Sequence, residues 1–313
     1  MSSMALSKIV YGCASGAMLE GQDVSDVLDQ VLDMGVNVFD TAENYGLSEC
    51  SLGNWIKSRG VRNRVHIISK GCHPYERDRV TPEDLKEDLE KSFRRMQTDY
   101  IDTYLLHRDD ISKPVGPIVE VLNECHKAGL IGRFGGSNWT VKRIQEANAY
   151  ASAHGLLPFT VSSPHYGIGV QVEDPFGGSS GCVNISGKSQ EKEREYYEIS
   201  QMPVFSYSSL SRGFFTGRVK SSEPENAVNV LDKFAVKGFC HPENFKRLER
   251  VEQLAAERDA TVPQIALAWL LNQKMNVYPI VSSTNPERFR DNLKALDIRL
   301  DEGEIKWLNL EEE

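Results

Sequence analysis

Short apolar runs alternate with longer helical segments along almost the whole chain, and this alternation limits the folds available to it. The runs are rich in Val, Ile, Phe and Tyr, which favour strands. Eight such strand candidates begin at Lys8, Val36, Arg64, Tyr100, Leu130, Phe159, Pro203 and Val277. Strands that alternate with helices form parallel sheets, because each helix returns the chain to the same edge.

The segments between these runs carry the helical period. Residues 23–35 place apolar side chains three and four positions apart, as one face of a helix requires. Residues 81–84, Thr-Pro-Glu-Asp, fit a capping box with proline at the first helical position. Further helices are expected over 118–129, over 140–155 and from Gln264, the last of which is apolar on nearly all sides.

Eight strand–helix repeats in 313 residues suit a closed (β/α)8 barrel. We therefore predict an α/β protein with one TIM-barrel domain over residues 1–313. A doubly wound open sheet is the alternative, but the Gly-x-Gly-x-x-Gly pattern of its dinucleotide-binding members is missing. Two long loops, about 167–190 and 213–245, follow the sixth and seventh strands and are expected on the catalytic face of the barrel.

Composition disfavours several classes of function. The net charge of -9 argues against binding to nucleic acid, which needs Lys and Arg to neutralise phosphates. The N-terminus resembles no signal peptide, and no apolar stretch approaches about 18 residues, the length of a membrane span. We therefore expect a cytoplasmic protein without membrane partners. The six cysteines are scattered and form no Cys-x-x-Cys pair, which favours reduced thiols over disulfides or structural zinc.

Polar side chains interrupt the apolar runs where three adjacent strands end. Asp40 ends the second run, with Tyr45 in the following loop, Lys70 ends the third and His107 ends the fourth. Singly, each has a more ordinary role: a turn, a packing anchor, a solvated charge or a structural histidine. Because the carboxyl ends of barrel strands form one catalytic face, their joint occurrence favours a shared site.

The four groups make chemical sense as a proton donor and its supports. The ordinary tyrosine pKa of about 10 is too high for efficient proton transfer at neutral pH. The Lys70 ammonium should lower the pKa of Tyr45, and a buried lysine needs a carboxylate partner, which Asp40 supplies. His107 can orient a substrate carbonyl by a hydrogen bond. The set predicts a general acid that protonates a carbonyl oxygen while hydride reaches the carbon.

Two motifs that contain these residues resemble the aldo-keto reductase family: FDTAENYG and KSFRRMQTDYIDTYLLHR. The resemblance covers nearly the whole chain. It implies Tyr45 as the general acid, Lys70 as the modulator of its pKa, Asp40 as the partner of Lys70 and His107 as the residue that orients the carbonyl. It also implies reversible reduction of an aldehyde or ketone by direct hydride transfer from NAD(P)H, without a metal.

Three further segments resemble cofactor-binding positions of the family. GGSNW implies that Ser137 and Asn138 bind the nicotinamide carboxamide. FSYSSLSRG implies that Tyr207 stacks on the nicotinamide while Ser208 to Leu210 line the pyrophosphate. VSSTNPERFRDN implies that the 2'-phosphate, ribose and adenine are bound by Ser282, Ser283, Arg288 and Asn292.

Two positions depart from the family pattern. Ser163 replaces a glutamine on the sixth strand that usually helps to hold the carboxamide. Ser282 stands where many members carry a lysine for the 2'-phosphate, but Arg288, whose guanidinium suits phosphate, still favours NADP(H) over NAD(H). Trp139 is expected either to line the substrate pocket or to pack at the start of a helix. The loop at 108–117 should shape that pocket together with the two long loops.

The sequence disfavours two other functions and leaves a third as the main alternative to a small-molecule carbonyl reductase. Residues 187–189 resemble the end of a phosphate-binding P-loop, but Cys182 occupies the required glycine position and no strand precedes it. A metal-dependent hydrolase would need a cluster of His and carboxylate ligands, and the chain has no His-x-His. The main alternative is a nicotinamide-binding redox sensor or scaffold subunit with slow turnover, since fold alone does not fix function.

Overall fold

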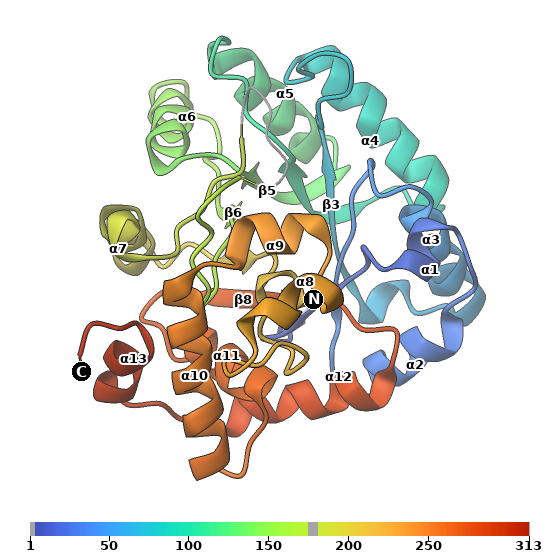
Figure 1. Cartoon of the computed structure of the whole chain (residues 1–313). Helices are drawn as coiled ribbons and strands as arrows, with labels where there is room; N and C mark the ends of the chain where they lie inside the picture. The colour runs from blue at the N-terminus through green and yellow to red at the C-terminus, as the bar shows by residue number, and fades with distance from the viewer. Residues whose placement is uncertain (1–3, 175–180, 313) are drawn as a thin grey trace. The chain divides into compact units, whose positions relative to one another are not determined.

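The computed structural model describes residues 4–174 and 181–312, and its parallel strands form a closed barrel in chain order (Figure 1). Each of the eight predicted apolar runs contributes one strand, which confirms the (β/α)8 fold. The strands are β1 Val10–Gly12, β2 Val38–Asp40, β3 His66–Gly71, β4 Ile101–Leu106, β5 Ile131–Ser137, β6 Val161–Ser163, β7 Val204–Ser206 and β8 Val277–Val281.

Helices separate the strands. Within the described part of the chain they are α1 Gly16–Leu19, α2 Ser25–Asp33, α3 Ser48–Arg59, α4 Pro82–Met96, α5 Gly116–Lys127, α6 Val141–Ala153, α7 Glu191–Ser200, α8 Ala227–Val230, α9 Lys233–Phe239, α10 Pro242–Glu257, α11 Val262–Leu271, α12 Pro286–Leu293 and α13 Glu302–Leu308. Of these, α2, α4, α5, α6 and α11 lie where the sequence predicts them. The segment 213–245, expected as a loop, holds α8, α9 and the start of α10. Residues 175–180 of the loop expected at 167–190 lie outside the described residues.

The predicted capping box at α4 forms only in part. The Thr81 hydroxyl accepts a hydrogen bond from the backbone N–H of Asp84 at 3.2 Å, as an N-cap should. The Asp84 carboxylate does not complete the reciprocal half. It accepts a hydrogen bond from the Thr81 hydroxyl at 2.8 Å and forms an ion pair with Arg77 at 2.6 Å. The aspartate side chain is shorter than the glutamate side chain of a full capping box, and the nearby guanidinium is a better partner for it than the backbone N–H of Thr81.

Contacts between residues divide the chain into two compact units. The first comprises Met1–Ser163 and Ser282–Pro286, and the second comprises Pro164–Val281 and Glu287–Glu313. The single domain predicted for residues 1–313 therefore stays a prediction.

Close backbone approaches in the first unit explain two of its glycines. A Cβ atom on Gly135 of β5 would lie 1.9 Å from the Val161 carbonyl oxygen of β6, so only glycine fits between the paired strands. A Cβ atom on Gly53 of α3 would lie 2.5 Å from the Met96 backbone at the end of α4. Figure 1 shows α3 and α4 side by side, and this glycine permits their close contact.

Buried histidines predict acid sensitivity. In the second unit, burial lowers the pKa of His165 from 6.5 to about 4, and its Nδ1 lies 2.9 Å from the Asn184 side-chain oxygen. In the first unit, burial also lowers the pKa of His66 to about 4. Below pH 6.5 these histidines become protonated in the unfolded chain but stay neutral in the folded chain. The free energy of unfolding therefore falls as the pH drops from 6.5 towards 4.

At about 1.4 kcal/mol per pKa unit, each histidine should account for a loss of about 3 kcal/mol over that range. Urea unfolding at several pH values measures this loss. The His165→Gln variant should show a shallower dependence on pH between 6.5 and 5, and an unchanged slope would contradict the assignment to His165.

Candidate active site

The first unit brings together the four ionisable residues predicted from the strand ends. Asp40 is the last residue of β2, Lys70 lies near the end of β3, and His107 directly follows β4. Tyr45 lies in the turn between β2 and α3. Asp40, Lys70 and His107 are each less than a tenth exposed, so their charges and hydrogen bonds act in a largely dry environment.

An ion pair joins two of the four groups and reaches the third. The Lys70 Nζ lies 2.7 Å from Asp40 Oδ1 and 2.9 Å from Asp40 Oδ2, and it donates to the Thr41 carbonyl at 2.8 Å. The same ammonium lies 4.8 Å from the centre of the Tyr45 ring. The His107 ring stands edge-on to Tyr45, with 5.6 Å between ring centres.

The pKa of Lys70 is shifted in the direction that keeps it charged, whereas burial raises the pKa of Asp40 and Lys70 only partly opposes this. Burial lowers the pKa of Lys70, but Asp40 and Tyr45 raise it more, so the ammonium persists. Burial also raises the pKa of Tyr45, and Lys70 only partly opposes this. Lys70 lowers the pKa of Tyr45 as predicted, but desolvation outweighs this effect and the net shift is upward. At neutral pH the phenol holds its proton.

His107 is neutral at this site. Burial is the main cause that lowers its pKa well below the usual range, and Lys70 adds to the effect. Its Nδ1 is buried and has no hydrogen-bond partner among the described residues. Because Nδ1 is closed off by burial, Nε2 is the ring nitrogen that a substrate can reach. A neutral imidazole that carries its proton on Nε2 can donate a hydrogen bond from it.

The Ser137–Asn138 pair is held rigidly beside His107. The Ser137 hydroxyl and the Asn138 backbone N–H both donate to the Ser163 carbonyl, at 2.9 Å and 3.2 Å. The Asn138 side chain donates to Ser137 Oγ at 3.2 Å and to the His107 carbonyl at 3.3 Å. Asn138 adopts a left-handed backbone with φ of 58°, which asparagine tolerates well. Ser163 thus supports the Ser137–Asn138 pair through its backbone carbonyl, and this support does not depend on the Ser163 side chain.

Trp139 packs at the start of a helix, one of the two roles expected of it. Its side chain is fully buried, and its indole N–H donates to the Arg108 carbonyl at 3.0 Å.

A buried charge cluster next to the tyrosine turn was not predicted. Glu43, two residues before Tyr45, is almost fully buried and forms an ion pair with Lys91 of α4. Arg95, one turn further along α4, donates to the Glu43 carbonyl at 2.6 Å and approaches the Glu49 carboxylate at 3.6 Å. Glu49 also accepts from Ser69 at 2.7 Å, the residue before Lys70. This Glu43–Glu49 cluster fixes the turn that carries Tyr45 against α4.

The remaining predicted cofactor residues are divided between the units. In the first unit, the Ser282 hydroxyl donates to the Gly12 carbonyl at 2.6 Å and the Ser283 carbonyl accepts from Tyr11 at 2.9 Å. In the second unit, Ser208 adopts a left-handed backbone with φ of 52°. The others placed in the second unit are Tyr207, Leu210, Arg288 and Asn292. The cofactor-binding roles of all these residues stay predictions.

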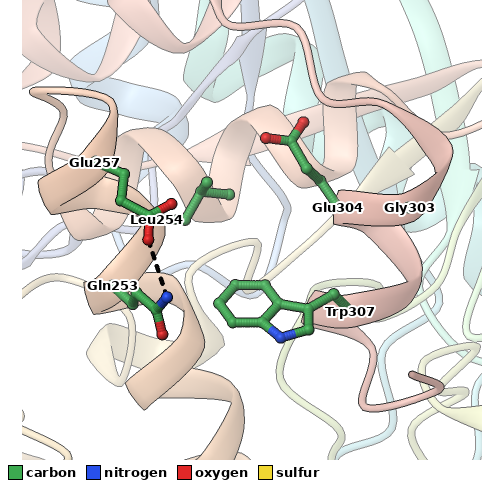
Figure 2. Close-up of a pocket in the computed structure, with 6 residues that line it drawn as sticks. All are labelled: Gln253, Leu254, Glu257, Gly303, Glu304 and Trp307. Carbon is green, nitrogen blue, oxygen red and sulfur yellow. Dashed lines mark hydrogen bonds between the residues drawn. The ribbon is translucent and has the colours of Figure 1, made fainter. Parts of the chain in front are cut away.

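A pocket of about 290 Å³ lies elsewhere, between α10 and α13 of the second unit. Figure 2 shows Trp307 and the side chains around it, none of which is a predicted site residue. The lining residues are Gln253, Leu254, Glu257, Gly303, Glu304 and Trp307. Over the described ranges, no group of three His, Cys, Asp or Glu side chains could hold a metal ion, and no helix is long and apolar enough to cross a bilayer.

Known proteins resemble this chain over most of its length. A relative from Schizosaccharomyces pombe, aldo-keto reductase yakc, whose name specifies NADP(+), is 26% identical, covering 95% of this chain and 86% of the relative. A relative from Oryza sativa subsp. japonica, named "Probable voltage-gated potassium channel subunit beta", is 25% identical over 95% of this chain and 89% of its own length.

A solved structure and a family profile agree with these relatives. The crystal structure of an aldo/keto reductase from Klebsiella pneumoniae in complex with NADP and acetate superposes with a TM-score of 0.70 at 25% identity, covering 98% of this chain and 91% of the other. The sequence profile of the Aldo/keto reductase family matches residues 8–309. Because that match spans nearly the whole chain, the chain belongs to the aldo/keto reductase family.

Proposed function

We propose that this protein reduces an aldehyde or ketone to the alcohol with NADPH, with Tyr45 as the proton donor. Membership of the family makes it an NAD(P)-dependent oxidoreductase. One observation carries the finer proposal. The Lys70 ammonium is paired with Asp40 at 2.7 Å and lies 4.8 Å from the centre of the Tyr45 ring, in a site that also holds a neutral His107.

Each residue has a distinct part in the reaction. His107 donates a hydrogen bond from Nε2 to the substrate carbonyl oxygen and so orients it towards Tyr45. Bound NADPH would supply the hydride that adds to the carbonyl carbon. Tyr45 transfers its proton to the oxygen as negative charge develops there, and Lys70 stabilises the phenolate that remains. Asp40 keeps Lys70 charged and in place. The balance is one hydride and one proton added to one C=O bond.

The second unit offers groups that fit the adenine end of the cofactor. The side-chain oxygen of Asn292 is buried and has no hydrogen-bond partner among the described residues, and an adenine amino group would satisfy it. Arg288 is exposed on the same helix, α12, where a guanidinium can meet a 2'-phosphate.

Replacing Arg288 by alanine should weaken the binding of NADPH more than the binding of NADH, because only NADPH carries the 2'-phosphate. A lost charge-assisted hydrogen bond of about 2 kcal/mol corresponds to a rise of about 30-fold in the Kd of NADPH. Fluorescence titration with each cofactor measures this, and Arg290→Ala, on the same helix, is the control. Equal weakening of both cofactors would argue against a 2'-phosphate contact.

The activity itself is tested by the loss of absorbance of the reduced nicotinamide. NADPH and NADH are supplied separately, with a reactive aromatic aldehyde or an α-dicarbonyl as acceptor. Turnover by the wild-type protein and its loss in Tyr45→Phe would support the proposal.

One alternative has a specific observation behind it, the similarity to a protein named as a potassium channel β subunit. Tight binding of NADPH without turnover of either acceptor would favour a slow redox sensor or scaffold subunit instead.

A further inference from the structure

His73 lies next to the proposed catalytic residues but has no part in the mechanism above. It follows Lys70 by three positions, in the segment after β3. Its ring stands edge-on to His107, with 5.0 Å between ring centres, and His107 in turn contacts Tyr45 at 5.6 Å. His73 also contacts the Tyr75 ring, with 5.9 Å between ring centres. Only part of the His73 side chain is buried, so solvent or a ligand can reach it.

The hydrogen bonding of His73 fixes which ring nitrogen carries the proton. Its Nδ1 lies 2.7 Å from the Pro74 carbonyl oxygen. A carbonyl oxygen can only accept, so Nδ1 must be the donor. Burial lowers the pKa of His73, and the positive charge of Arg108 adds to this, so the ring is neutral at pH 7. Nε2 is then unprotonated and can only accept a hydrogen bond.

No donor among the described residues reaches this Nε2, since the one hydrogen bond of His73 within them is made by Nδ1. The neighbouring His107 is expected to present the opposite character, a donor at Nε2. Two adjacent imidazoles thus present one donor and one acceptor. A carbonyl oxygen needs the donor, and a hydroxyl on the next carbon atom would match the acceptor.

We propose that His73 binds a hydroxyl group on the carbon next to the reacting carbonyl, so that hydroxylated aldehydes or ketones are the preferred substrate class. This inference rests on the proposed reductase function. A site that accepts a hydrogen bond from a substrate hydroxyl discriminates against the analogue without it, because the acceptor is left unpaired. His73 is partly accessible to water, so the discrimination is moderate, about 5- to 10-fold in kcat/KM.

Two matched substrates and two variants test the proposal. The substrates are 2-hydroxypropanal and propanal, with NADPH consumption as the measurement. The variant His73→Phe keeps a ring against His107 but removes both nitrogens. The variant His73→Gln keeps a side-chain acceptor. The quantity measured for each protein is the ratio of kcat/KM for 2-hydroxypropanal to kcat/KM for propanal. The two aldehydes differ in intrinsic reactivity, but this difference cancels when the ratio of a variant is compared with that of the wild-type protein.

The ratio should fall about 5- to 10-fold in His73→Phe, mainly through a higher KM for 2-hydroxypropanal. It should stay closer to the wild-type ratio in His73→Gln, and circular dichroism should show both variants folded. An equal loss on both aldehydes would mean that His73 only packs against His107, and an unchanged ratio would likewise overturn the proposal. If the wild-type protein reduces neither aldehyde nor the test acceptors, the proposed function itself fails. Propanal turnover with an unchanged ratio removes only the role of His73.

Discussion

Replacing Tyr45 by phenylalanine is expected to lower kcat about 10²- to 10⁴-fold, the usual contribution of a positioned general acid. The ring, its contact with His107 and its cation–π contact with Lys70 are all compatible with phenylalanine. Only the hydroxyl group and its proton are lost. The Kd of NADPH should therefore change little. Stopped-flow measurement of a single turnover separates the chemical step from release of the products.

Tyr150→Phe is the matched control, because that hydroxyl binds Glu120 on the surface of the protein. Its kcat should stay near the wild-type value. A Tyr45→Phe variant with near wild-type kcat would remove Tyr45 from the role of acid. A loss in Tyr45→Phe that appears only as weaker cofactor binding would point to a structural role for the hydroxyl.

Replacing Lys70 by methionine is expected to reduce both stability and activity. It leaves the Asp40 carboxylate, which is almost fully buried, without its ion-pair partner. Removing one member of a buried pair typically lowers the free energy of unfolding by about 3 to 5 kcal/mol. Urea unfolding at pH 7 measures this change. The kcat should also fall, because no ammonium remains to stabilise the phenolate of Tyr45.

The double variant Asp40→Asn with Lys70→Met separates these two effects. Removing both charges should restore much of the lost stability, since no uncompensated charge stays buried. It should not restore activity. If the double variant were no more stable than Lys70→Met, the loss would come from packing. If it were active, Lys70 would not be needed for proton transfer.

The fold could be predicted because each strand lies in a mainly apolar run and five of the helices, α2, α4, α5, α6 and α11, carry a helical period or end signals. Other helices were not predicted, and among them α8 and α9 within 213–245 have only four and seven residues, too few to show a period. The four ionisable residues could be predicted for a related reason. Each is a polar residue at the carboxyl end of an apolar strand or just after it, where a barrel builds its sites.

The surroundings of the site could not be predicted from local sequence. Glu43 and Glu49 look like ordinary loop and helix charges, and their burial depends on Lys91 and Arg95, more than forty residues later. The net direction of the Tyr45 pKa shift could not be predicted for the same reason. Its neighbour Lys70 can be read from the sequence, but the extent of desolvation is a property of the folded site.

The division of the chain at Ser163 has an evolutionary consequence. The residues proposed to move the proton all lie within positions 40–107, before that boundary, while Arg288 and Asn292 lie in the other unit. Recombination between relatives with a crossover between Ser163 and Pro164 would therefore exchange the predicted adenine-side residues, together with the segment Ser282–Pro286 of the first unit, without exchanging the proton donor. Nucleotide preference and proton chemistry could then be inherited separately, and chimaeric genes joined at this point are natural starting material for selecting either one.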